Sequence, residues 1–126
     1  MLDYADIPRS SRVSSPRYMM TQHIKGHLEL ATLRILSDGE RHGYGIVRLL
    51  DISGNDLLRA GEGTIYPLLK KLERNGHVKS RWIGGKKMYR LSHQGKIAYD
   101  LNLDQWKSFS SAMELFLSKP LKEVNT

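Results

Sequence analysis

Basic side chains are concentrated in one stretch of the chain, between Arg59 and Arg90. This stretch holds nine lysines and arginines but only two acids, Glu62 and Glu73, so its net charge of +7 equals that of the whole 126-residue chain. Such clustering favours a polyanionic partner, because these cations neutralise phosphates and release the counterions of DNA. The alternative is a solvated basic face without a partner. The basic residues are Arg59, Lys70, Lys71, Arg74, Lys79, Arg81, Lys86, Lys87 and Arg90.

Few other residues have types and spacing suited to chemistry. The chain has no cysteine, which excludes disulfides, thiolate zinc sites, iron–sulfur clusters and cysteine nucleophiles. His23 and His27 have an i, i+4 spacing that can hold a metal, but no third ligand is near them and the other histidines are scattered. No nucleophile–base spacing, phosphate-binding loop or dinucleotide fingerprint occurs. We therefore expect no catalysis, no cofactor and no metal site.

Length and composition predict one globular domain, with 40% hydrophobic and 26% charged residues. No apolar run reaches the ~18–20 residues of a membrane span. The first residues, MLDYADIPRS, carry acids where a secretory signal would be basic and then apolar. These features predict a cytoplasmic protein with no membrane partner.

Three helices are predicted behind an N-terminal arm. Residues 1–23 contain two prolines and two serine pairs with little apolar periodicity, so we expect a flexible arm. The first helix spans Lys25–Leu36 and is apolar on most sides, as a buried central helix is. The second follows His42-Gly43 and stops before Ser53. Tyr44, at its start, is predicted either to anchor a phosphate or to lie half-buried in the core.

The third predicted helix combines an apolar stripe with a basic face. Ile65, Leu68, Leu69 and Leu72 repeat at i, i+3, i+4 and i+7. Pro67 must lie in the first turn, which puts the start near Glu62–Thr64, and Gly76 ends the helix in the left-handed conformation. No acid precedes Lys70 or Lys71 by three or four residues, so we expect both to contact phosphate. For Tyr66 the alternatives are DNA contact and packing on the second helix. The outward face is Thr64, Tyr66, Pro67, Lys70, Lys71 and Arg74.

A β-hairpin is predicted next, from two six-residue runs around Gly84-Gly85. A two-residue turn pairs Ile83 with Lys86 and Val78 with Leu91. One face, with Val78, Trp82, Tyr89 and Leu91, is expected to cover the core. The other carries like charges, which destabilise an isolated hairpin unless an anion lies against them. These charges are Lys79, Arg81, Lys86 and Arg90, and Lys86 and Lys87 at the tip are expected to contact the DNA backbone.

A long last helix is predicted from the N-cap Ser92 to about Ser118, a length of ~39 Å at 1.5 Å per residue. Six of its residues follow a 3, 4, 3, 4, 3 spacing, which is typical of a helix that packs against another helix. The expected partner is the same helix of a second copy, with Asn102 setting the register. The alternative is that these residues close the core of one copy. The six residues are Tyr99, Asn102, Trp106, Phe109, Met113 and Phe116.

The order of these elements predicts a winged helix-turn-helix, mainly α with a small β-hairpin, followed by a long dimerisation helix. The expected boundaries are 1–23 for the arm, 24–91 for the DNA-binding domain, 92–118 for the helix and 119–126 for a tail. In this design the third helix enters the major groove of DNA and the hairpin touches the flanking backbone or minor groove.

Several motifs make the chain similar to the PadR-type transcriptional regulators, over roughly Lys25 to Phe116, and Glu62–Leu69 is the most specific of them. Two features depart from the usual pattern: only Gly84-Gly85 forms the tip of the wing, and Met88 stands where an aromatic residue is usual. The matching residues are Gly26–Leu33, His42–Tyr44, Glu62–Leu69, Lys71–Glu73, Gly76, Trp82, Tyr89–Ser92 and Gly95.

The resemblance implies a bacterial, dimeric DNA-binding repressor of the smaller subgroup, with one C-terminal dimerisation helix. It adds a small aromatic effector as a candidate partner, because some relatives release DNA on binding such molecules. Trp106 is then expected either to stack on a flat ligand or only to pack. We interpret the chain as a homodimeric regulator that binds an inverted repeat. The alternatives are a winged-helix module that binds another protein and a nonspecific architectural DNA binder.

Overall fold

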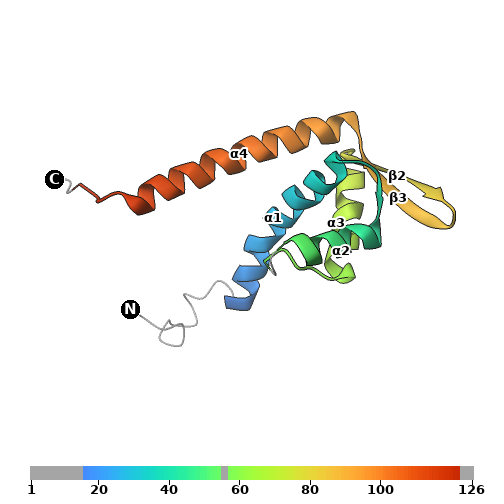
Figure 1. The fold of residues 1–126 in the computed structure, drawn as a ribbon, viewed down its shortest axis with the longest axis horizontal. Helices are drawn as coiled ribbons and strands as arrows, with labels where there is room; N and C mark the ends of the chain where they lie inside the picture. The colour runs from blue at the N-terminus through green and yellow to red at the C-terminus, as the bar shows by residue number, and fades with distance from the viewer. Residues whose placement is uncertain (1–15, 55–56, 123–126) are drawn as a thin grey trace.

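The computed structural model describes residues 16–54 and 57–122, with side chains from residue 26 onward (Figure 1). Its three strands form one antiparallel sheet in the order β1-β3-β2. The architecture confirms the predicted winged helix-turn-helix with a long last helix. The elements are α1 (Pro16–Ser37), β1 (Arg41–His42), α2 (Gly43–Ser53), α3 (Glu62–Arg74), β2 (Val78–Ile83), β3 (Lys86–Leu91) and α4 (His93–Ser118).

The first helix starts earlier than expected. α1 begins at Pro16, nine residues before the predicted start at Lys25, so the predicted start is wrong and residues 16–23 of the predicted arm belong to this helix. Proline fits the first position of a helix, where its missing N–H would have no helical partner in any case. The rest of the predicted arm, residues 1–15, lies outside the described residues.

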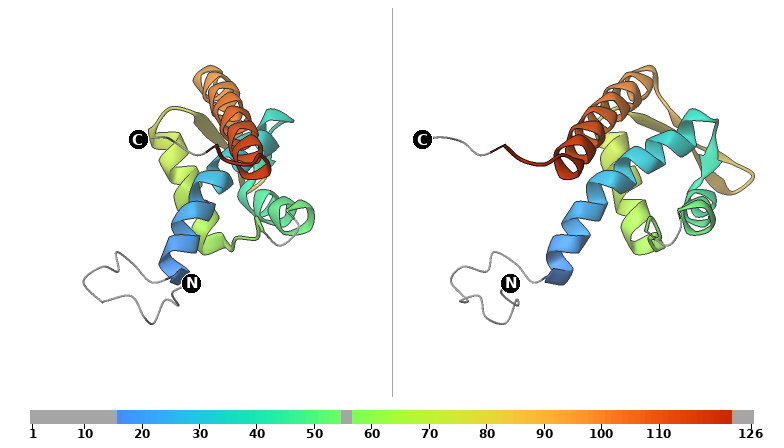
Figure 2. Two further views of the ribbon diagram at one scale, coloured as in Figure 1. Left: turned by 90° about the vertical axis from the view of Figure 1, so that its left-hand side faces the viewer. Right: turned by 60° about the vertical axis from the view of Figure 1, so that its left-hand side comes forward.

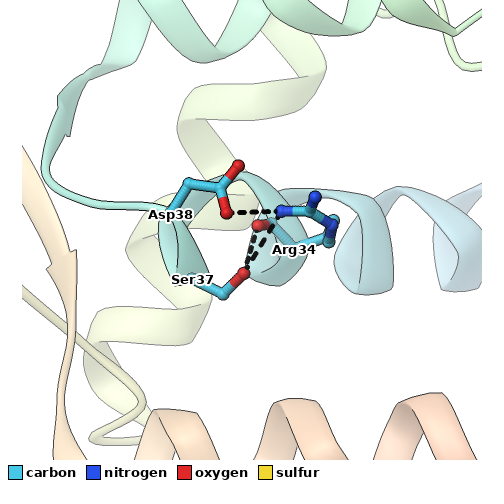
Figure 3. A network of polar contacts seen from close by, with 3 residues as sticks. All are labelled: Arg34, Ser37 and Asp38. Atoms are coloured by element: carbon cyan, nitrogen blue, oxygen red, sulfur yellow. Dashed lines mark hydrogen bonds and ion pairs between the residues drawn. The ribbon is translucent and has the colours of Figure 1, made fainter.

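The C-terminal end of α1 carries a small polar network (Figure 3). The Ser37 hydroxyl donates to the Arg34 carbonyl at 2.6 Å, and the Arg34 guanidinium pairs with Asp38 at 2.8 Å. The hydrogen bond from Arg34 to Asp38, together with the charge of Asp38, raises the pKa of Arg34. Since both side chains are exposed, solvent screens the pair and it adds little to stability.

One hydrophobic core joins α1, α2, α3 and the base of the sheet, which pack closely in all three views (Figures 1 and 2). The stripe predicted for α3 points inward, although Leu68 lies at the edge of the core. Burying apolar side chains is the main force that holds these elements together. The buried residues are Leu28, Leu33 and Leu36 of α1, Ile46 and Leu50 of α2, Ile65, Leu69 and Leu72 of α3, and Val78, Tyr89 and Leu91 of the sheet.

α3 ends in a glycine turn to which the start of α4 is attached. Gly76 has the predicted left-handed φ of 78°, and the His77 amide donates to the Leu72 carbonyl at 2.9 Å, as in a Schellman motif. The Ser92 hydroxyl donates to the Gly76 carbonyl at 2.6 Å and accepts from the Gly95 amide at 3.0 Å. Ser92 is therefore the predicted N-cap of α4 and also joins α4 to the end of α3.

The hairpin has the predicted register, with Val78 opposite Leu91 and Ile83 opposite Lys86. Gly84 and Gly85 both have positive φ, 55° and 80°, which a two-residue type I′ turn requires. The short strand β1 was not predicted. It pairs Arg41 with Tyr89 along the free edge of β3. A strand of two residues is too short to show an alternating pattern, so the sequence carried no signal for it.

The prediction that Trp82 covers the core is wrong. Its side chain is 71% exposed, whereas Val78 and Leu91 at the base of the same face are buried. The hairpin extends beyond the helices, so only its base lies over the core (Figure 1). Strand alternation assigns a face to each residue, but it does not say how far along the hairpin the core reaches.

α4 runs across the end of the domain and continues past it (Figure 1). Its first half packs against α1, where Tyr99 joins the core and Asn102 is half-buried. The later members of the predicted seam are exposed, among them Phe109 at 63% and Phe116 at 61%. Within the described part of one copy, only the first turns of α4 therefore pack on the core of that copy, and the later residues of the seam do not.

Candidate nucleic-acid interface

The outward face of α3 carries the predicted polar and basic residues. The buried stripe fixes the rotation of the helix, so that Thr64, Tyr66, Pro67, Lys70, Lys71 and Arg74 are all exposed. Lys70 and Arg74 are one helical turn apart and lie on the same side. This face is accessible along its whole length in the described structure.

Tyr66 meets both conditions that were considered for it, packing on α2 and exposure to a ligand. Its ring packs against Gly43 at the start of α2, so closely that a Cβ atom on Gly43 would overlap the Tyr66 ring. Burial of the hydroxyl, followed by the charge of Glu62, raises the pKa of Tyr66. The side chain is nevertheless 39% exposed. Tyr66 thus packs on α2 and still presents part of its surface to solvent.

Tyr44, in the first turn of α2, is exposed rather than half-buried in the core. Its ring lies 6.5 Å from that of His42 in a tilted arrangement. An exposed Tyr44 side chain is accessible to a ligand at the start of α2.

Four of the nine clustered cations are paired with carboxylates, which the sequence analysis did not anticipate. Lys71 lies 3.5 Å from Glu29, and Arg81 donates twice to Glu40, each time at 2.8 Å. The hydrogen bond from Arg81 lowers the pKa of Glu40 and raises that of Arg81. The remaining two pairs are Lys87 with Glu73 at 3.8 Å and Arg59 with Asp51 at 2.6 Å.

The other five cations lie within 4.0 Å of no carboxylate among the described residues, and all five are exposed. We call this set the unpaired cations. They are Lys70 and Arg74 on α3, and Lys79, Lys86 and Arg90 on the hairpin. Exposed cations that form no ion pair with a carboxylate are the ones that gain most from a phosphate.

The hairpin cations lie on two faces. Val78 and Leu91 point to the core, so Lys79 and Arg90, one position along, point to the opposite face and away from α3. Arg81 is on this outer face too. Lys87 is on the core-side face, next to Glu73 of α3. The structure therefore brings Lys87 to α3, but it does not bring Lys79, Arg81 or Arg90 there.

A groove of about 1020 Å³ lies between α1, the segment before α3, and α4. Its wall is mostly apolar and includes Leu30 of α1, Leu57, and four members of the predicted seam on α4. Those four residues are Tyr99, Trp106, Phe109 and Met113.

No metal centre is present among the described residues, since they contain no cluster of three or more potential ligands. The side chain of His23 lies outside the described part. In the same part of the chain, no helix is long and apolar enough to cross a membrane.

Comparisons with known proteins agree with this geometry. Residues 32–100 match the family described as the transcriptional regulator PadR-like family. A transcriptional regulator from Clostridium thermocellum is 25% identical with a TM-score of 0.71, over 77% of this chain and 99% of that one. A PadR-like regulator from Bacillus cereus is 26% identical with a TM-score of 0.68, over 79% of this chain and 99% of that one. PadR from Bacillus subtilis, solved in complex with operator DNA, is 31% identical with a TM-score of 0.54, over 79% of this chain and 52% of that one. These relatives are transcriptional regulators, and nothing in the described site points to catalysis.

Proposed function

Since the chain belongs to the PadR-like family of transcriptional regulators, we propose that it is a sequence-specific DNA-binding repressor that acts as a homodimer. The operator in this proposal is an inverted repeat, and each copy binds one half. The operator DNA in the structure of the Bacillus subtilis relative supports the choice of ligand.

The outward face of α3 carries the proposal. Lys70 and Arg74 have no carboxylate partner among the described residues, and the buried stripe holds them outward. A helix with this face fits the major groove of B-DNA, where Thr64, Tyr66 and Pro67 at its start reach base edges or backbone. Lys71 is also proposed to contact DNA, since its exposed ion pair with Glu29 is weak enough to exchange for a phosphate.

The other proposed contacts flank α3. Tyr44 at the start of α2 binds a phosphate, and Lys86 and Lys87 at the tip of the wing contact the neighbouring backbone. Lys79, Arg81 and Arg90 face away from α3, so in this proposal they act on more distant phosphates through their charge.

Dimerisation is assigned to α4. Trp106, Phe109, Met113 and Phe116 are large apolar side chains that one copy leaves partly or largely exposed. Their spacing suits a second α4, with Asn102 and Tyr99 nearer the body of each copy. Two α3 helices held about 34 Å apart by this pairing reach two half-sites one turn of DNA apart.

The groove beside Trp106 is the proposed site of a small aromatic effector. Its volume of about 1020 Å³ and apolar wall suit a flat molecule stacked on the indole. Such a molecule would relieve repression only by binding the DNA-free arrangement of the two copies more tightly than the DNA-bound one.

The test is selection of binding sequences from random duplex DNA, followed by protection mapping on the enriched sequence. The proposal predicts an inverted repeat and two protected halves about 10 base pairs apart. Failure to enrich any sequence would instead favour an architectural binder, and failure to bind DNA at all would favour a protein-interaction module.

A further inference from the structure

We propose that Glu73 is a positioning residue that fixes the angle between α3 and the wing, and thereby the sequence specificity of the protein. The inference rests on the proposed function, because it concerns how two DNA-contacting elements are held relative to one another. Glu73 lies in the last turn of α3, next to Arg74 and three residues after Lys70.

The carboxylate of Glu73 contacts both strands of the wing. One oxygen, Oε2, accepts a hydrogen bond from the Ser80 hydroxyl of β2 at 2.5 Å. The other, Oε1, lies 3.8 Å from the Lys87 ammonium of β3. The same ammonium lies 5.6 Å from the centre of the Tyr89 ring, which is buried beneath it. The Glu73 side chain thus joins α3 to both β2 and β3.

The charge of Glu73 is opposite to that expected on a DNA-binding surface. It is the only acidic residue between Glu62 and Asp100, and it lies among the cations of α3 and the wing. A carboxylate in this place repels phosphate and lowers the affinity for any DNA. Its two contacts give it a geometric role that a neutral, apolar side chain could not perform.

These contacts act on the part of the wing that has least other support. The base of the hairpin is fixed by Val78 and Leu91 in the core, and its outer face by the bidentate contact of Arg81 with Glu40. Towards the tip, Trp82 and Ile83 are exposed. Among the described residues, the contact of Glu73 with Lys87 is the polar contact between wing and helix that lies nearest the tip. Glu73 and Glu40 therefore hold opposite faces of the hairpin.

Two consequences separate this role from a simple effect of charge. Loss of the Glu73 side chain removes a repulsive charge, so affinity for random DNA should rise. Loss of the contact with Ser80 lets the wing move relative to α3, so affinity for the operator should not rise in proportion. The ratio of the two affinities should fall about five- to tenfold, which corresponds to the net contribution of one typical hydrogen bond.

The experiment measures that ratio, operator over random duplex, for the full chain and four variants. Glu73→Ala removes both contacts, and Ser80→Ala removes only the hydrogen-bond donor. Glu73→Gln removes the charge and keeps an acceptor for Ser80. Asp38→Ala is the matched control, because it also removes a carboxylate paired with a cation, here Arg34 at the end of α1 (Figure 3).

We expect the ratio to fall for Glu73→Ala and Ser80→Ala. It should stay within about twofold of the original chain for Glu73→Gln, which keeps the acceptor for Ser80, and for Asp38→Ala, which removes an exposed ion pair of little weight. Thermal melting followed by circular dichroism checks that each variant is folded. Should Glu73→Ala be unfolded, the smaller deletion in Ser80→Ala decides the matter alone.

An unchanged ratio for the folded Glu73→Ala and Ser80→Ala variants would overturn the inference and leave the proposed function standing. Equal losses for Glu73→Gln and Glu73→Ala would also overturn it, since charge would then be the cause. A chain without preference for any sequence would overturn the proposed function, and this inference with it.

Discussion

The Tyr66 ring of α3 lies directly against Gly43, the first residue of α2, with no room between them for a side chain on Gly43. The contact joins the starts of the two helices that form the helix-turn-helix. It also determines how far the Tyr66 ring projects from α3. The identity of residue 43 therefore affects the shape of the proposed DNA-binding face, although Gly43 itself is buried.

Replacing Gly43 tests this relationship. Gly43→Ala must displace the Tyr66 ring, and we expect a loss of about 1–3 kcal/mol in the free energy of unfolding, together with weaker DNA binding. Gly63→Ala is the control, because a Cβ there meets no atom within 4 Å. In α3 this alanine should be neutral or stabilising by up to about 1 kcal/mol. Urea unfolding measures the stability of the two variants. Equal effects of the two substitutions would show that the Tyr66 ring is free to move.

Two neighbouring lysines on α3 should differ in their effect on DNA binding. Lys70 has no carboxylate partner among the described residues, whereas Lys71 lies 3.5 Å from Glu29. Lys70→Ala should reduce the slope of log affinity against log salt by about 1 per copy, as expected for one lost phosphate contact in each. Lys71→Ala should reduce it less, because that lysine first has to leave Glu29. Salt titrations monitored by fluorescence anisotropy give both slopes, and a larger effect at Lys71 would reverse the assignment.

Glu40 should titrate at an unusually low pH. Its hydrogen bond from Arg81 lowers its pKa from the ordinary value of 4.5, since the charged form is the one that is stabilised. The stabilising contribution of this contact is therefore present above about pH 4.5 and is lost as the pH falls through the lowered pKa. NMR titration of the Glu40 side-chain carboxyl carbon checks this. Arg81→Ala should return the midpoint towards 4.5; an unchanged midpoint would mean that Arg81 is not the cause.

The exposed side of α4 should hold two copies together. Phe109→Arg or Met113→Arg places a charge in the proposed seam and should raise the dimer dissociation constant about 30-fold or more. Ser111→Arg is the matched control, because it lies two residues from both and so on the opposite side of the helix. Sedimentation equilibrium distinguishes the variants. A monomeric original chain, or an equal effect of Ser111→Arg, would refute the assignment of α4.

Much of the fold could be predicted because a few residues impose strong local constraints. Pro67 and Gly76 set the limits of α3, and Gly84-Gly85 sets the register of the hairpin through their positive φ angles. The start of α1 was missed, because the sequence of residues 16–24 has no regular apolar pattern that would indicate a helix.

The electrostatics of the site could be predicted only in part. The number of clustered cations is visible in the sequence, but their partners are not. Glu40 and Arg81 are 41 residues apart, and Glu29 and Lys71 are similarly distant, so rules for helical neighbours cannot detect these pairs. Glu73 gave one visible signal, since it is an isolated acid within a basic stretch.

The salt dependence of operator binding tests most directly whether the face of α3 and the tip of the wing bind DNA phosphates. The original chain and a variant with Lys70, Arg74 and Lys86 all replaced by alanine are titrated between about 50 and 200 mM salt. For 6–10 contacted phosphates, the original chain should lose affinity on the order of 10³-fold or more across this range. The variant should show a log–log slope smaller by about 3 per copy. A flat titration of the original chain, or equal slopes for the two proteins, would contradict the account.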